Sequence, residues 1–257
     1  EGLKEAMAAA RQRHIVLIPG IELSTDHPGA ECHVLGYFLD YDSPELRTTL
    51  REFREGRVAR GQAMVERLLE LGLPLSWERI QELAHSGTVT RAHVAEALLE
   101  AGLVASRQEA FELYIGHGRP AYVSRFKLSP EDAVRLILQM HGVPVLAHPT
   151  YAEPTRDWLA AGNARLPWPF LERLVGAGLL GLEAYYGDYS AALCAQLVEM
   201  AQHYGLIVTG GSDFHGHEER PALGSVPVPL NVLHDLYRLA HQVGSSWVNE
   251  GSAWVAP

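Results

Sequence analysis

Two hydrophobic patterns alternate along this chain. The Ala-rich stretch 3–13 predicts a helix, so the sequence begins within a helix. Runs of β-branched and apolar residues at 14–23 and 32–39 predict two buried strands, and the polar stretch 24–31 between them predicts a loop. The chain therefore starts with strand-forming sequence after a single helix.

The character changes from Ser43 for about eighty residues. An amphipathic pattern at 45–71 predicts a long helix, and three more helices follow Ser76, Thr90 and Ser106, which are good N-cap residues. Glycines close three of these predicted helices, at Gly72, Gly102 and Gly116. We therefore expect residues 43–118 to form an all-helical insert within an α/β unit made of 1–42 and 119–257.

After Gly118 short apolar runs alternate with helical patterns. Strands are predicted at 143–147, 179–186 and 206–209, separated by helices at 129–142, 169–177, 189–204 and 230–242. This alternation is typical of βαβ units and predicts a mainly parallel sheet. In such sheets, chemistry gathers at the carboxyl ends of the strands.

Composition narrows the class of protein. With 257 residues, 47% of them hydrophobic and 20% charged, the chain has the make-up of an ordinary globular protein. It has no apolar run of membrane-spanning length and no signal-peptide pattern at its start, so we expect no membrane partner and a cytoplasmic location. The net charge of −10 opposes binding to duplex DNA, and two cysteines without a Cys-x-x-Cys motif favour neither a disulfide framework nor a thiolate metal site.

Metal-competent side chains follow or interrupt several predicted strands. Glu22 ends the first strand, His33 lies in the second, His148 follows the third, and Asp213 with His215 follows the last. Carboxylate and imidazole groups are ligands for Zn²⁺, Mn²⁺ or Fe²⁺. This convergence predicts a divalent-metal site.

Each residue also has a plainer interpretation. A solvated glutamate, a core histidine and a polar loop would account for Glu22, His33 and the 213–215 triplet taken singly. His148 is better placed, because Pro149 restrains it to an extended conformation at a strand end. In an extended segment Asp213 and His215 would share one face, and the glycines at 210–211 would let backbone approach closely.

Other polar residues complete the candidate site. Glu183 is a charge within an apolar strand, where it needs a partner, and we expect it to orient a ligand histidine or an arginine. Arg91, at the start of a predicted helix, and Arg119, in a Gly-Arg-Pro segment, are candidates for binding phosphate, although a solvated surface role is as plausible for each.

Taken together, these motifs resemble the polymerase-and-histidinol-phosphatase (PHP) superfamily. The matching segments are IPGIELS at 18–24, HVLGY at 33–37, AHP at 147–149, GLE at 181–183 and GSDFHG at 211–216, in the family's order. The helical segment ahead of GRPAYV at 118–123 resembles members that hydrolyse nucleoside 3′,5′-bisphosphates and trim short RNA from the 5′ end.

The resemblance implies a distorted (β/α)7 barrel with up to three divalent metals at its mouth. Glu22 would bridge two metals, and His33 and His148 would complete the second site. Asp213 would serve the first metal and His215 the third, while Arg91 and Arg119 would hold phosphates. A metal-bridging hydroxide would then attack phosphorus.

The sequence departs from the family at its beginning. The family opens with a His-x-His strand, an Asp and a Thr-Asp-His segment, and none of these precedes Glu22 in this sequence. By ligand count one metal site of three is then intact. Either the sequence lacks the N-terminal segment of an ordinary enzyme, which we favour, or it is an impaired relative with its first strands lost.

We therefore expect a metal-dependent phosphoesterase acting on a small phosphorylated nucleotide or short RNA. One alternative is a histidinol-phosphate-type phosphatase. Another, from a different class, is a catalytically impaired module that binds metal or nucleotide without turnover.

Overall fold

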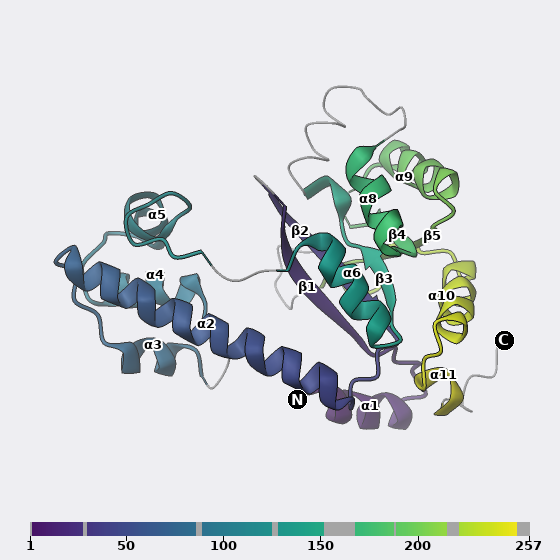
Figure 1. Cartoon of the computed structure of the whole chain (residues 1–257), viewed down its shortest axis with the longest axis horizontal. Coiled ribbons are helices and arrows are strands. Elements are labelled where there is room, and N and C mark those ends of the chain that lie inside the picture. The colour runs from purple at the N-terminus through teal and green to yellow at the C-terminus, as the bar shows by residue number, and fades with distance from the viewer. Residues whose placement is uncertain are drawn as a thin grey trace. The chain divides into compact units, whose positions relative to one another are not determined.

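The computed structural model describes residues 2–27, 30–85, 89–124, 128–151, 168–187, 189–214 and 221–250 (Figure 1). The chain divides into two compact units, one of Glu1–Ser43 with Lys127–Pro257 and one of Pro44–Phe126, called here the sheet unit and the helical unit. Among the described residues, no helix has both the length and the hydropathy needed to cross a membrane.

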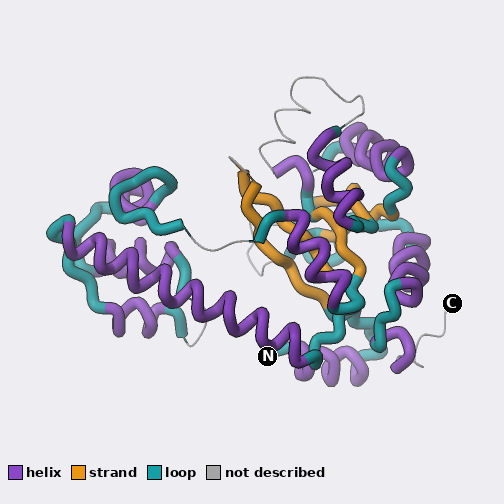
Figure 2. The backbone as a smooth tube through the Cα atoms, in the orientation of Figure 1, coloured by secondary structure: helices purple, strands orange, loops and turns teal. Residues whose placement is uncertain are grey.

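The sheet unit contains a five-stranded sheet with the strands in chain order. The strands are drawn in orange in Figure 2. The β1–β2 and β2–β3 pairs are antiparallel, whereas β3, β4 and β5 run parallel. The strands are β1 (Gly20–His27), β2 (Ala30–Tyr37), β3 (Val143–Leu146), β4 (Gly181–Tyr186) and β5 (Ile207–Gly211). The expected mainly parallel sheet is therefore only half correct, because two of the four pairings are antiparallel.

The first two strands differ from the prediction. The strand expected at 14–23 starts only at Gly20, and most of the expected loop 24–31 is strand. Polar residues are accommodated there because neighbouring strands satisfy them: the hydroxyl of buried Thr25 donates to the carbonyl of Cys32, 2.7 Å away on β2. A polar stretch can thus continue a hairpin.

The sheet is open in the part of the chain that the structure describes, with β1 and β5 as its outer strands. A closed barrel needs its outer strands to pair, and no such pairing occurs among these residues. The coarser description, a mixed α/β fold, is confirmed.

Helices pack on the sheet much as the sequence predicts. Ser129 caps α6 by accepting from the Asp132 N–H, and Pro130 occupies its first turn. Val232 and Leu236 of α10 share an apolar cluster with the sheet residues Val143, Val145 and Ile207. The helices of this unit are α1 (Leu3–Gln12), α6 (Pro130–Gln139), α8 (Pro169–Ala177), α9 (Ala191–His203), α10 (Asn231–Gln242) and α11 (Trp247–Glu250), with a 3₁₀ turn η2 (Pro149–Tyr151).

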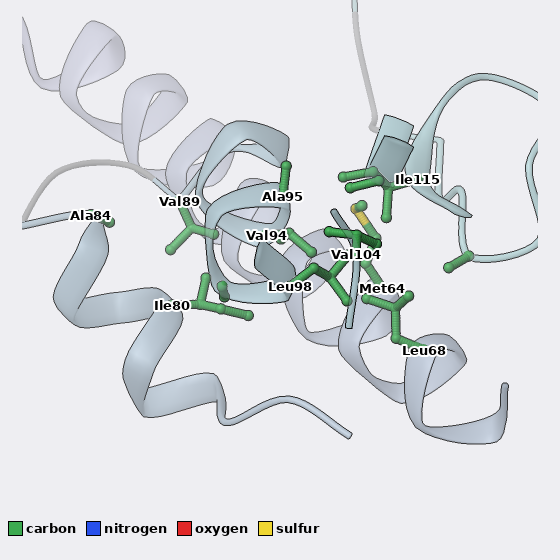
Figure 3. Close-up of a cluster of buried hydrophobic side chains, with 13 residues drawn as sticks. Met64, Leu68, Ile80, Ala84, Val89, Val94, Ala95, Leu98, Val104 and Ile115 are labelled. Atoms are coloured by element: carbon green, nitrogen blue, oxygen red, sulfur yellow. The ribbon is translucent and has the colours of Figure 1, made fainter. Parts of the chain in front are cut away.

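The helical unit has its own hydrophobic core (Figure 3). Its elements are α2 (Pro44–Glu70), α3 (Trp77–Leu83), α4 (Arg91–Glu100), α5 (Arg107–Ala110) and the π-helical turn η1 (Phe111–Ile115). Met64 and Leu68 of α2 are buried in one cluster with Ile80 and Leu98 of the following helices. Ser76 and Ser106 cap α3 and α5 through their side-chain oxygens, as predicted.

Candidate metal centre

Three of the predicted ligands converge on one point. Glu22 Oε1 lies 2.7 Å from His33 Nδ1 and 3.3 Å from His148 Nε2, and the two ring nitrogens are 3.2 Å apart. In the described part of the chain, this is the one group of three acidic, His or Cys residues whose potential ligand atoms all lie within 4.8 Å of one another. We call it the Glu-His-His cluster.

The hairpin register explains why Glu22 and His33 meet. Glu22 on β1 is opposite Leu35, and His33 on β2 is opposite Ser24, so the two side chains are diagonal neighbours on one face. Neither stands at a strand end, so the expected position of Glu22 is wrong. In an antiparallel pair, register rather than strand termini decides which side chains meet.

His148 reaches the cluster from the end of β3. Its φ is 22°, so the extended conformation expected before Pro149 is wrong. Its backbone N–H donates to Glu183 Oε2 of β4 at 2.7 Å. The partner expected for Glu183 is therefore a candidate ligand histidine.

The pKa values of the two carboxyl groups that contact His148 are shifted in opposite directions. Hydrogen bonds with His148 and His33 hold the pKa of Glu22 far below its usual range. Burial raises the pKa of Glu183 to about 7, against the opposing effect of the His148 N–H. Glu22 is thus an anion throughout the neutral range, whereas Glu183 is poised between its two forms.

Asp213 follows β5 in a left-handed conformation, with φ of 49°. Its Oδ2 accepts a hydrogen bond of 2.8 Å from the hydroxyl of Tyr186 at the end of β4. The ring of Tyr186 also lies 5.6 Å, centroid to centroid, from the ring of His148. Sequence reasoning missed Tyr186, since nothing in an apolar GLEAYY strand marks its second tyrosine as a polar contact.

Three further residues were expected at the site: His215, Arg91 and Arg119. His215 lies outside the described residues. Arg91 and Arg119 belong to the helical unit. The Arg91 guanidinium lies over the rings of Phe111 and Tyr122, 5.6 and 5.9 Å from their centroids, and among the described residues it makes no ion pair. Arg119 is exposed and likewise has no carboxylate partner there.

Similarity to known proteins identifies the family. No family model matches the chain. The 5′-3′ exoribonuclease Rnm of Salmonella typhimurium is 34% identical over 199 residues, which cover 77% of this chain and 65% of that protein. The 3′,5′-nucleoside bisphosphate phosphatase of Chromobacterium violaceum is 31% identical over 223 residues, covering 85% of this chain and 74% of the relative.

A solved structure agrees with these relatives. The crystal structure of a protein from Bifidobacterium adolescentis, named a putative metal-dependent phosphoesterase, superposes with a TM-score of 0.72 at 26% identity, over 93% of this chain and 82% of the other. The chain belongs to the family of PHP-type phosphoesterases. It spans just under two thirds of the length of the Salmonella relative.

Proposed function

We propose that this protein is a metal-dependent phosphoesterase that hydrolyses a phosphomonoester of a small nucleotide, such as a nucleoside 3′,5′-bisphosphate, and acts on short RNA 5′ ends. The observation that carries the proposal is the Glu-His-His cluster, in which one carboxylate contacts two imidazoles, one in β2 and one after β3. The two relatives described above, named as a 5′-3′ exoribonuclease and a 3′,5′-nucleoside bisphosphate phosphatase, support substrates of this kind.

The donor set fits a divalent cation. Ligands at about 2.1 Å in a tetrahedral arrangement would be about 3.4 Å apart, and two of the three separations in the cluster are 3.2 and 3.3 Å. Oxygen and imidazole nitrogen suit Zn²⁺, Mn²⁺ and Fe²⁺. We propose that Glu22, His33 and His148 hold one ion of this group, and that Asp213 and His215 serve further ions.

A bound cation and two of the protein's own groups would prepare the reaction. A bound cation polarises a phosphoryl oxygen and makes water acidic enough to act near neutral pH. Glu22, being ionised at all relevant pH values, would keep its ligand oxygens available without losing a proton first. The Glu183 contact would hold the backbone of His148, the residue whose Nε2 contacts Glu22.

Substrate phosphates are proposed to bind Arg91 and Arg119. The Arg91 guanidinium lies over the rings of Phe111 and Tyr122, so little side-chain freedom would be lost when it binds an anion. Bidentate contacts of a guanidinium suit phosphate oxygens.

We also propose that the open sheet is part of the distorted (β/α)7 barrel that the family resemblance implies, with residues 43–118 as its helical insert. The division into a sheet unit and a helical unit supports this arrangement. A cytoplasmic location stays a prediction.

The test is phosphate release from a nucleoside 3′,5′-bisphosphate by the purified chain in Mn²⁺, compared with release from histidinol phosphate. We expect the wild type to release phosphate from the nucleotide. In His148→Ala this activity should fall by about 100-fold or more, and the bound Mn²⁺ should be lost as well. His234→Ala, which removes an exposed histidine of α10, is the control and keeps full activity. Unchanged metal content and activity in His148→Ala would refute the proposal.

A further inference from the structure

Tyr186 contacts candidate ligands that follow two different strands. Its hydroxyl donates to Asp213 Oδ2 at 2.8 Å, after β5, and its ring meets the ring of His148, after β3, at 61° between planes. The tyrosine is itself 5% exposed, so both contacts are made inside the protein. One buried side chain thus links two positions that the backbone ladder does not join.

A β-bulge in β4 makes this link possible. Glu183 pairs with Thr209 and Tyr185 with Gly210, so two residues of β4 span one step of β5. In regular alternation, positions 183 and 186 would point to opposite faces, but one extra residue restores them to the same face. Glu183 and Tyr186 consequently both contact His148, one at its backbone and one at its ring.

The two linked ligands need such support. His148 and Asp213 have φ of 22° and 49°, a region that non-glycine residues occupy at a cost. Both follow the last residue of their strand, where ladder hydrogen bonds no longer constrain the chain. Side-chain contacts must therefore hold their orientation.

Tyr186 is well anchored for this task. Its ring packs against Tyr189 with centroids 5.1 Å apart. The Tyr189 hydroxyl in turn accepts a hydrogen bond of 2.9 Å from the hydroxyl of Thr150, two residues after His148. Movement of Tyr186 would therefore disturb the segment that carries His148.

We propose that Tyr186 is a positioning residue of the metal centre: its hydroxyl fixes the carboxylate of Asp213, and its ring fixes the imidazole of His148. This role rests on the proposed function, since it assumes that these two side chains bind metal. It extends that function by making the geometry of two ligands depend on one tyrosine of a strand that supplies no ligand itself.

The test compares Mn²⁺ binding by Tyr186→Phe, Tyr186→Leu and the control Tyr185→Phe in the full chain. Phenylalanine keeps the ring on His148 and removes the hydrogen bond to Asp213, whereas leucine also removes the ring contacts with His148 and Tyr189. Tyr185 belongs to the same strand, and its hydroxyl makes no hydrogen bond among the described residues. Isothermal titration gives the affinity, and the electron paramagnetic resonance line shape of bound Mn²⁺ reports the ligand geometry.

We expect about a 10-fold loss of Mn²⁺ affinity in Tyr186→Phe, a larger loss in Tyr186→Leu, and an altered line shape in both. Tyr185→Phe should match the wild type. An affinity and line shape of Tyr186→Phe equal to wild type overturn this inference and leave the proposed function standing. A wild-type chain that binds no Mn²⁺ at all overturns both.

Discussion

The antiparallel and parallel halves of the sheet place their candidate ligands by different means. Glu22 and His33 lie within β1 and β2, and the hairpin register alone makes them neighbours. His148 and Asp213 follow β3 and β5, at φ of 22° and 49°, and are contacted by Glu183 and Tyr186 of β4. The first half uses backbone pairing, and the second uses side-chain contacts around strained positions.

Because of this difference, we expect substitutions in the two halves to affect the candidate metal centre in different ways. A register error would move Glu22 and His33 to the wrong face together, so the hairpin either forms correctly or fails as a unit. The parallel half can instead lose one contact at a time. We therefore expect graded effects from changes in β4 and β5 and all-or-none effects from changes in the hairpin ligands.

The largest effect is expected for Glu22→Gln, which alters the carboxylate that contacts both His33 and His148. Loss of its negative charge should lower Mn²⁺ affinity by more than about 100-fold, because a ligand bound directly to metal matters at least as much as its outer partners. Isothermal titration measures the affinity, with exposed Glu5→Gln as control. Equal Mn²⁺ affinity in Glu22→Gln and wild type would contradict the proposal that Glu22 is a metal ligand.

In the parallel half of the sheet, the buried carboxyl group of Glu183 should make the stability of the protein depend on pH. The folded state binds the proton of Glu183 more tightly than the unfolded state, because burial raises the pKa from 4.5 to about 7. Stability should therefore fall as pH rises from 4.5 through 7, by about 2 to 3 kcal/mol between pH 5 and pH 8 in metal-free protein.

Glu183→Gln should remove that dependence while keeping an acceptor oxygen for the His148 N–H. Urea unfolding at the two pH values in chelator measures the difference from wild type, and exposed Glu172→Gln should leave the dependence intact. If the free energy of unfolding differs between wild type and Glu183→Gln by the same amount at pH 5 and at pH 8, Glu183 is not the cause of the pH dependence.

The bulge should respond to a single methyl group. A Cβ on Gly210 would collide with the carbonyl oxygen of Tyr185, whereas a Cβ on Gly211 meets nothing within 4 Å. Gly210→Ala should cost about 2 kcal/mol of unfolding free energy, and Gly211→Ala less than about 0.5 kcal/mol. Equal costs for the two substitutions, measured in urea, would show that the bulge does not need a glycine.

The smallest effect is expected in the hairpin, away from its ligands. Thr25→Val removes the hydroxyl that donates to the Cys32 carbonyl and should cost about 1 kcal/mol of unfolding free energy. Mn²⁺ affinity should not change, since Thr25 points to the face opposite Glu22. Ser24→Ala is the adjacent control for stability. Weaker Mn²⁺ binding by Thr25→Val would contradict this prediction, because it would show that Thr25 affects the metal ligands as well as the stability of the hairpin.

Local signals predicted most of the helices. The prediction of a helix at 169–177 matches α8, and the caps at Ser76, Ser106 and Ser129 all hydrogen-bond as expected. These features depend on neighbours within four residues, so they can be inferred from sequence. The start of β1 could not, because residues 14–19 have the same apolar character as a strand but do not pair in one.

The candidate ligands were also predictable as residue types. Glu22, His33 and His148 were selected for carboxylate and imidazole chemistry near strands, and they do lie together. The sequence did not predict how these side chains come together. Glu22 and His33 are diagonal neighbours on paired antiparallel strands and do not lie at strand ends.

The sequence by itself determined the helical elements, most of the strands and the chemical identity of the cluster, since each of these depends on local periodicity or on side-chain type. Only the tertiary structure decided that the first three strands are antiparallel, that a bulge turns Tyr186 toward Asp213, and that His148 adopts a left-handed backbone. Pairing direction, bulge position and backbone strain are set by contacts between segments distant in the chain, and no local pattern records them.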